Sequence, residues 1–117
     1  MTDTLPYLLL DPDGPPLTHD SDVNDLLSQA WAVPTRTLAI PVARLGERFF
    51  DLASGLLGAV AQKFQNYETR LAIVGDVSGV CAKSRSLRDF VHETNGRDAL
   101  WFVADEAALR ARLGVQP

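Results

Sequence analysis

The sequence predicts a single α/β domain over residues 1–117, with four strands in a mostly parallel sheet and four helices. Three observations lead to this prediction. Short apolar runs alternate with segments whose apolar residues recur every three or four positions. Gly, Pro, Asp and Asn bound the runs and mark turns. The length of 117 residues fits one domain, and such alternation implies crossovers between parallel strands.

The first strand and the first helix are separated by a strong turn signal. The apolar run 7–10 stops at Asp11, where a segment rich in proline begins. We expect Asp20 or Ser21 to cap the helix and Pro34 to end it. Its expected buried stripe consists of Val23, Leu26, Leu27, Ala30 and Trp31.

The second strand, 37–40, is interrupted by Pro41 and resumed by Val42. Proline lacks the N–H group that a central strand uses, so we expect either an edge position or a strand that ends early. The second helix is expected to begin near Asp51 or Ser54. Its expected buried stripe consists of Leu56, Leu57, Val60, Ala61, Phe64 and Tyr67.

Two continuous apolar runs, 71–74 and 100–103, are typical of strands that are buried on both faces. Trp101, in the second run, is expected in the core. The helix between the runs is expected to begin at Ser84 or Ser86.

The last two helix ends also carry residues with a known conformational preference. Asn95 and Gly96 tolerate the left-handed conformation and are expected to end the third helix. Asp105 is expected to cap the fourth helix, and Gly114 is expected to end it.

Composition excludes several classes of function. The chain has 15 acidic and 11 basic residues, a net charge of −4, and no cluster of Lys and Arg that could neutralise phosphates, so we expect no nucleic-acid partner. No apolar run has the length of a membrane span, and no signal peptide is recognisable. The single Cys81 fits a reducing compartment, so we expect a cytoplasmic protein with no membrane partner.

Neither histidine has a second ligand at a spacing typical of zinc sites, so no metal site and no cofactor is predicted. Four aspartates follow the expected strands and could meet at the carboxyl-end rim of the sheet, where ligands of parallel sheets bind. Each also sits where a turn or cap favours aspartate, and separate structural roles are the preferred interpretation. The four are Asp11, Asp51, Asp76 and Asp105.

The segment 75–79 is the only loop with spaced glycines between a strand and a helix. It matches neither a dinucleotide fingerprint nor a P-loop, so a plain tight turn is expected.

The polar flank of the second helix and the end of the third form the predicted protein-binding surface. The solvated face of a helix is the simpler interpretation of the same pattern. The binding residues proposed for this surface are Lys63, Asn66, Tyr67, Glu93 and Asn95, with Asp51 and Asp76 as further candidates.

Several blocks after the first strand occur in a specific order. They are 49–52, 55–56, 62–67, 71–76, 86–91, 93–95 and 102–103. With these blocks the chain resembles a bacterial family that is catalogued only as a domain of unknown function. The resemblance covers nearly the whole chain after the first strand and implies no activity.

A broader resemblance is to STAS domains, which are named for sulfate transporters and anti-sigma factor antagonists. The segment 51–56 resembles their Asp-Ser-Ser-Gly-Leu loop, although Leu52 and Ala53 separate Asp51 from Ser54. The resemblance implies a STAS-like topology and makes Ser54 the candidate phosphorylation switch, whereas the residues alone predict a helix cap. Because alternation does not determine strand order, a flavodoxin-like or receiver-like arrangement is the alternative.

These observations favour a non-enzymatic regulatory or protein-interaction domain that acts through helix surfaces near the segment 51–54. The alternative is a small-molecule or metal-phosphate binder, or an enzyme, that uses the acidic rim. The oligomeric state is not predicted.

Overall fold

Four parallel strands form one sheet, in the order β1-β2-β3-β4. The structure is a computed structural model that describes residues 6–19, 21–33 and 35–114. The strands are β1 (Leu8–Leu9), β2 (Thr37–Pro41), β3 (Arg70–Val74) and β4 (Leu100–Val103). In register, Ile40 lies beside Ile73, which lies beside Phe102. The predicted four-stranded parallel sheet is therefore confirmed.

Four long helices connect or follow the strands, as predicted: α1 (Asp22–Ala32), α3 (Leu56–Asn66), α5 (Arg85–Asn95) and α6 (Glu106–Leu113). Two short helices were not predicted, namely α2 (Glu47–Phe50) and α4 (Ser78–Lys83). With four and six residues they are too short to display a periodic apolar stripe. Two 3-10 turns, η1 (Val42–Arg44) and η2 (Leu52–Ser54), complete the connections.

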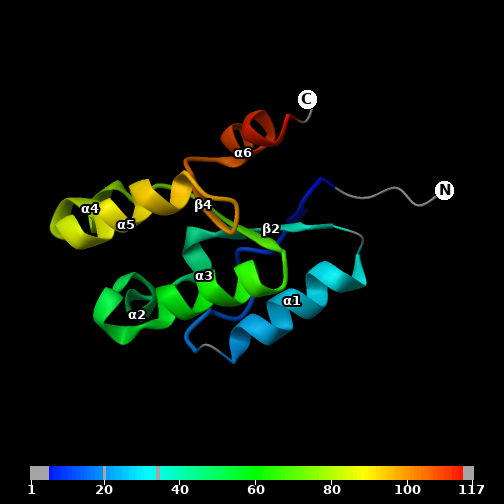
Figure 1. Cartoon of the computed structure of the whole chain (residues 1–117), viewed down its shortest axis with the longest axis horizontal. Coiled ribbons are helices and arrows are strands. Elements are labelled where there is room, and N and C mark those ends of the chain that lie inside the picture. The colour runs from blue at the N-terminus through cyan, green and yellow to red at the C-terminus, as the bar shows by residue number, and fades with distance from the viewer. Residues whose placement is uncertain (1–5, 20, 34, 115–117) are drawn as a thin grey trace.

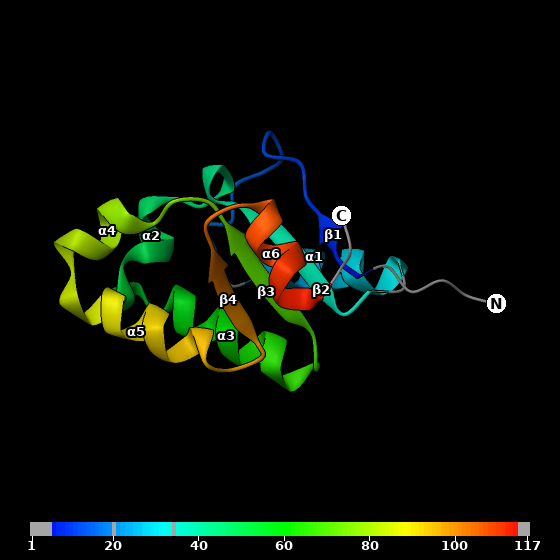
Figure 2. The same cartoon turned by 90° about the horizontal axis from the view of Figure 1, so that it is seen from above.

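The sheet separates two layers of helices. The helices α1, α2 and α3 lie on one side and α6 lies on the other (Figure 1). Figure 2 shows the sheet from above, with α6 lying across β3 and β4. Among the described residues, no helix is both long and apolar enough to span a membrane.

Alternate residues of each strand enter different cores. Leu38, Leu71 and Leu100 point to the larger core, which they share with the buried stripes of α1 and α3 and with Leu87 of α5. Ala39, Ala72 and Trp101 point to the smaller core beneath α6. Side chains of successive strand residues alternate between the two faces of the sheet. In β2, β3 and β4, residues on both faces are buried.

Two aromatic residues that were predicted to be buried are exposed, so that prediction was wrong. Trp31 is 57% exposed and Tyr67 is 52% exposed. At 3.6 residues per turn, Trp31 lies about 90° from the centre of the α1 stripe, at its border. There it contacts Tyr67 edge to face, with ring centroids 5.4 Å apart. Trp101, by contrast, is buried as predicted.

Pro41 ends β2 and does not mark a sheet edge. The strand lies between β1 and β3, and Pro41 pairs with Val74 as its last residue. Of the two expectations for this proline, early termination is confirmed and the edge position is wrong.

The helix caps agree in part with the predictions. Ser84 accepts a hydrogen bond from the Leu87 N–H at 3.2 Å, and Asp105 caps α6. Gly114 ends α6 with φ of +75°. Ser21 makes no capping hydrogen bond, whereas Asp22 accepts hydrogen bonds from the N–H groups just before the helix. Asp20 and Pro34 lie outside the described residues.

The outer edge of β4 is closed by side chains from the end of α5. The Thr94 hydroxyl donates to the Leu100 carbonyl at 3.2 Å, and the Asn95 Oδ1 atom accepts from the Phe102 N–H at 2.7 Å. These bonds satisfy backbone groups that an edge strand would otherwise expose to other chains. Asn95 therefore has a structural role, which argues against its predicted role in binding.

The hydrogen bond from Phe102 to Asn95 lies at the point where α5 ends. The helix ends at Asn95 and Gly96, as predicted, although Gly96 has φ of −83° and does not adopt the left-handed conformation that it tolerates. The chain leaves the helix through a tight turn, in which the Arg97 N–H donates to the Thr94 carbonyl at 3.0 Å. The turn directs the chain back into β4.

We predict that Asn95→Ala lowers the free energy of unfolding by about 1–2 kcal/mol, because the Phe102 N–H loses its only side-chain acceptor. Asn95→Asp keeps an acceptor oxygen and should retain most of the stability. The matched control Asn66→Ala removes an exposed amide and should change stability by less than about 0.5 kcal/mol. Urea denaturation measures all three variants; equal losses at positions 95 and 66 would contradict the prediction.

Candidate functional site

The four aspartates at the carboxyl-end rim serve local turns and caps. Each accepts a hydrogen bond from a backbone N–H two or three residues further along the chain. This agrees with the prediction that the four aspartates have separate structural roles. The donors are Asp13 for Asp11 at 2.8 Å, Ala53 for Asp51 at 3.0 Å, Ser78 for Asp76 at 2.8 Å and Ala108 for Asp105 at 2.8 Å. Such bonds stabilise the carboxylate form: the hydroxyl and then the N–H of Ser78 lower the pKa of Asp76. In the part of the chain that the structure describes, no three His, Cys, Asp or Glu side chains are grouped to hold a metal.

The predicted loop 75–79 is shorter in the structure, because α4 begins at Ser78, and the Asp76 side chain accepts from the Ser78 N–H at 2.8 Å within it. Gly75 has φ of +143°, and a Cβ atom there would lie 2.6 Å from the Val42 Cγ2 atom. Glycine is therefore required by backbone conformation and by close packing, not by a phosphate.

Ser54 stabilises the corner that leads into α3. Its hydroxyl lies 2.8 Å from the carbonyl oxygens of both Arg48 and Asp51, and it accepts from the Leu56 N–H at 3.2 Å. The N-cap position itself belongs to Gly55, with φ of +78°. The Ser54 side chain therefore accepts a hydrogen bond at the start of α3, as predicted for a cap, but the N-cap residue is Gly55 and not Ser54. A phosphate on Ser54 would have to break these contacts.

The predicted polar flank of α3 divides between two neighbours. Lys63 donates from Nζ to the Asn24 Oδ1 atom at 3.0 Å and so links α3 to α1. Tyr67 contacts Trp31 on the same side. Asn66 accepts from the Gln62 side chain at 2.9 Å. Only the opposite side of α3, which carries Gln62 and Gln65, remains open toward α5.

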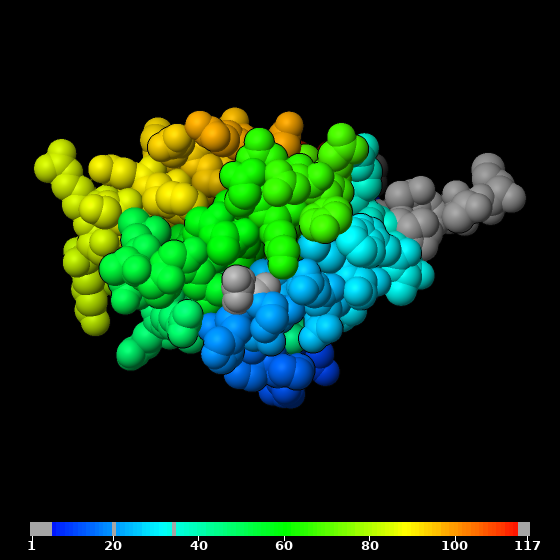
Figure 3. Space-filling model, turned by 60° about the horizontal axis from the view of Figure 1, so that its bottom comes forward, coloured from blue at the N-terminus to red at the C-terminus, as the bar shows by residue number. Residues whose placement is uncertain are grey.

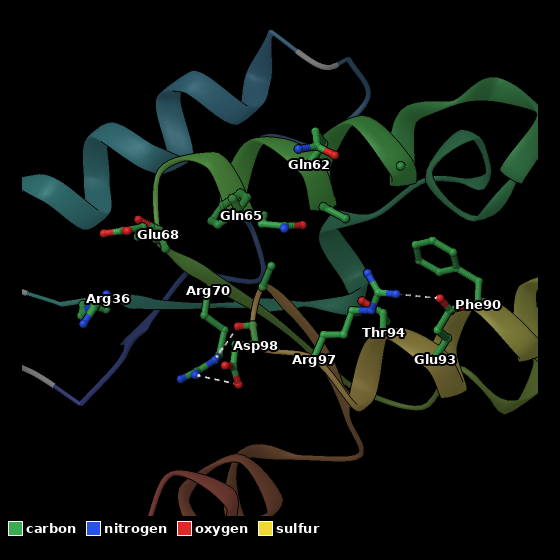
Figure 4. A pocket seen from close by; sticks show the side chains of 15 residues that line it. Arg36, Gln62, Gln65, Glu68, Arg70, Phe90, Glu93, Thr94, Arg97 and Asp98 are labelled. Carbon is green, nitrogen blue, oxygen red and sulfur yellow. Dashed lines mark hydrogen bonds and ion pairs between the residues drawn. The ribbon is translucent and has the colours of Figure 1, made fainter.

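A groove of about 940 Å³ lies between α3 and α5, at the amino ends of β3 and β4. Figure 3 shows the helix layer as a surface, with α3 (green) between α1 (blue to cyan) and α5 (yellow). Gln62 and Gln65 come from α3, and Phe90, Glu93 and Thr94 come from α5 (Figure 4). The groove therefore combines amide, aromatic and charged groups.

Charged residues of both signs surround the amino-end side of the groove. Glu93 pairs with Arg97 at 3.0 Å, and the Arg70 Nε atom donates to the Asp98 carbonyl at 2.8 Å (Figure 4). The remaining two, Arg36 and Glu68, have no ion-pair partner in the described part of the chain. A partner with complementary charges can pair with them.

Arg70, which begins β3 beside the groove, has a firmly held guanidinium. The Arg70 guanidinium stacks on the Trp101 ring at 3.8 Å from the centroid, and Arg112 stacks on the same ring at 3.8 Å. Burial lowers the pKa of Arg70, while Asp98 opposes this effect. Trp101 belongs to the core beneath α6, so these cation–π contacts hold the Arg70 guanidinium on the α6 side of the sheet, away from the groove side chains of α3 and α5.

Glu68 occupies a conformation that normally belongs to glycine. Its φ is 54°, and it follows α3 where the Thr69 N–H donates to the Phe64 carbonyl at 2.9 Å and the Glu68 N–H to the Gln65 carbonyl at 3.1 Å. This is the Schellman pattern of helix ends, in which glycine is preferred at the left-handed position. A glutamate there is strained, and its side chain lines the groove.

Part of this groove was missed by the sequence reasoning. The polar flank and Glu93 were predicted, but Arg36, Arg70 and Arg97 were not, because they come from the starts of different strands. Only the strand order brings them to one edge of the sheet. The Glu93 and Arg97 pair, four residues apart, is a signal that could have been found.

A family comparison identifies the chain as a whole. The profile of a family described as a domain of unknown function (DUF4180) matches residues 2–113. The chain belongs to the DUF4180 family. No curated protein and no solved structure matches it. The function of this DUF4180 domain therefore has to be argued from its own geometry.

We predict that Glu68→Gly raises the free energy of unfolding of this DUF4180 domain by about 1 kcal/mol, because glycine relieves the left-handed strain. The matched control is Gly55→Ala, which introduces the same strain at φ of +78° and should lower stability by a similar amount. Urea denaturation at neutral pH measures both. A loss of stability in Glu68→Gly would show that the side chain compensates for the strain.

Proposed function

We propose that this DUF4180 domain is a non-enzymatic protein-interaction domain that binds a polypeptide segment in the groove between α3 and α5. The groove carries the proposal, because it joins an open volume of about 940 Å³ with polar groups of several kinds. The groove lies between the second and third predicted long helices, but of the binding residues predicted on them only Glu93 lines it; Lys63, Asn66, Tyr67 and Asn95 do not.

The chemistry of the groove favours a polypeptide over a small ion. Two side-chain amides on α3 can pair with peptide N–H and C=O groups, and Phe90 offers an apolar contact. Arg36 and Glu68, which have no ion-pair partner among the described residues, can pair with opposite charges on the partner. Protein interfaces typically combine an apolar centre with such a polar rim.

The strain at Glu68 supports the same location. Replacing this residue by glycine is expected to stabilise the fold, so the glutamate side chain is retained at a cost of about 1 kcal/mol. Strained residues of this kind cluster at functional sites. Glu68 lies at the groove and not at the carboxyl-end rim.

The acidic rim, which was the alternative site, has less support. Each of its four aspartates is engaged in its own turn or cap. A regulatory domain that acts by binding fits the groove better than an enzyme or metal-phosphate binder at that rim.

The proposal has three further parts. We propose a STAS-like form and a bacterial origin, which the resemblance of segment 51–56 and of the later blocks supports. We propose a cytoplasmic location, which the half-buried single Cys81 fits. The proposed regulation does not include phosphorylation of Ser54, since its hydroxyl bonds to the backbone of three residues.

We predict that Gln65→Trp lowers partner retention at least tenfold, because an indole on the exposed face of α3 fills the groove. The matched control is Ala107→Trp, which places the same indole on exposed α6, across the sheet. Affinity capture from a lysate of the source organism, with mass spectrometry, identifies and quantifies the retained proteins. Thermal unfolding verifies that both variants fold.

Retention that falls equally in the two variants would point to a different surface. Retention that Gln65→Trp leaves unchanged would contradict binding in the groove.

A further inference from the structure

A buried arginine outside the groove has hydrogen-bonding capacity that the fold does not use. Arg44 ends η1, just after β2, and is only 8% exposed. Its carbonyl accepts from the Leu17 N–H at 2.8 Å, and Leu17 forms a parallel bridge with Leu45. Arg44 therefore lies where the segments after β1 and β2 meet.

One part of the Arg44 side chain has a clear structural role. Its Nε atom donates to the Pro15 carbonyl at 2.9 Å. The guanidinium also lies against Gly14, where a Cβ atom would come within 2.7 Å of the Arg44 Cζ atom. These contacts orient the guanidinium plane.

The two terminal Nη groups are not explained by this role. In the described part of the chain, Arg44 has no ion-pair partner, and no acceptor is found for either Nη group. Among the described residues, every fully buried side-chain nitrogen or oxygen has a hydrogen-bond partner. Because the Nη atoms have none, they are not fully buried and face solvent. The Nη groups are therefore available to an acceptor that enters from outside, on a guanidinium whose remaining surface is buried.

The opening is a pocket of about 300 Å³ at the start of α1. Its polar lining is Arg44, Asp22, Asp25 and Gln29. Its apolar lining comes from Pro15, Pro16, Leu17 and Leu26. It lies beyond the carboxyl ends of β1 and β2, on the side where parallel sheets bind ligands.

The charges of the pocket select a class of ligand. The guanidinium fork matches a carboxylate, to which it can donate two parallel hydrogen bonds. The backbone N–H groups of Thr18 and then His19 donate to Asp22 and lower its pKa, so this carboxylate stays ionised. Asp25 is exposed, and it has no hydrogen-bond partner among the described residues. Two carboxylates disfavour a ligand that is only anionic, and they favour one that also carries an ammonium group.

We propose that the pocket around Arg44 binds a free α-amino acid with an apolar side chain. The ligand carboxylate pairs with the Arg44 Nη groups, the ammonium group lies near Asp25, and the side chain contacts the prolines and leucines. This site is separate from the groove, so it stands whether or not the groove binds a polypeptide.

The test is a set of NMR titrations of the full chain, with the Arg44 Nε–H signal and the backbone amides of 15–29 as reporters. The probes are L-leucine, 4-methylpentanoate, which lacks the ammonium group, and 3-methylbutylamine, which lacks the carboxylate. We expect L-leucine to shift the reporters in a saturable way and to bind at least tenfold more tightly than either of the other two. Groove amides should not shift.

Three variants assign the contacts. Asp25→Asn, at an exposed position, should weaken L-leucine binding about tenfold, whereas 4-methylpentanoate, which has no ammonium group, should bind more tightly because a repelling carboxylate is removed. Gly14→Ala should displace the guanidinium and weaken both, which keeps the proposal testable if Arg44→Met does not fold. The matched control Arg48→Met removes an exposed arginine of α2 and should have no effect.

Three results would overturn the proposal. The first is that L-leucine causes no saturable shift. The second is that 4-methylpentanoate binds as tightly as L-leucine. The third is that binding is unchanged in both Gly14→Ala and Asp25→Asn.

Discussion

The structure depends on one constraint, the consecutive order of four parallel strands. Parallel neighbours need a crossover, and crossovers have one hand, so a sheet with the order β1-β2-β3-β4 places its connecting helices on one face. The helices α1, α3 and α5 therefore share a core, and α6 alone packs on the opposite face. The small side chains of Ala39 and Ala72 line the core beneath it.

The same constraint separates the two ends of the sheet. At the carboxyl ends every strand turns into a helix or a loop, and the aspartates there are used for turns and caps. At the amino ends the chain arrives from helices, and the groove between α3 and α5 lies at this end. On the opposite face of the sheet, the Trp101 ring and its two stacked arginines hold the start of β3 against α6.

Sequence reasoning succeeded where local chemistry decides the structure. The run 100–103 and the Asp105 cap were predicted at the right residues, because a buried strand and a helix start each have a local signature. It failed where an outcome depends on neighbours distant in the sequence. Trp31 lies at the border of the α1 stripe, where periodicity alone does not decide burial and the position of α3 does. The pocket of Arg44 is formed by the loop 11–17, which has no periodic signal. The roles of Asn95 and Lys63 are likewise determined by their partners on β4 and α1.

The most direct test of the central claim is site-specific photo-crosslinking in the source organism. A photoreactive phenylalanine analogue is placed at Gln62, in the groove, or at Ala104, an exposed position at the carboxyl-end rim. If the groove is the binding surface, the probe at Gln62 crosslinks to a defined protein and the probe at Ala104 does not. Crosslinking from Ala104 without crosslinking from Gln62 would place the function at the rim and contradict the account.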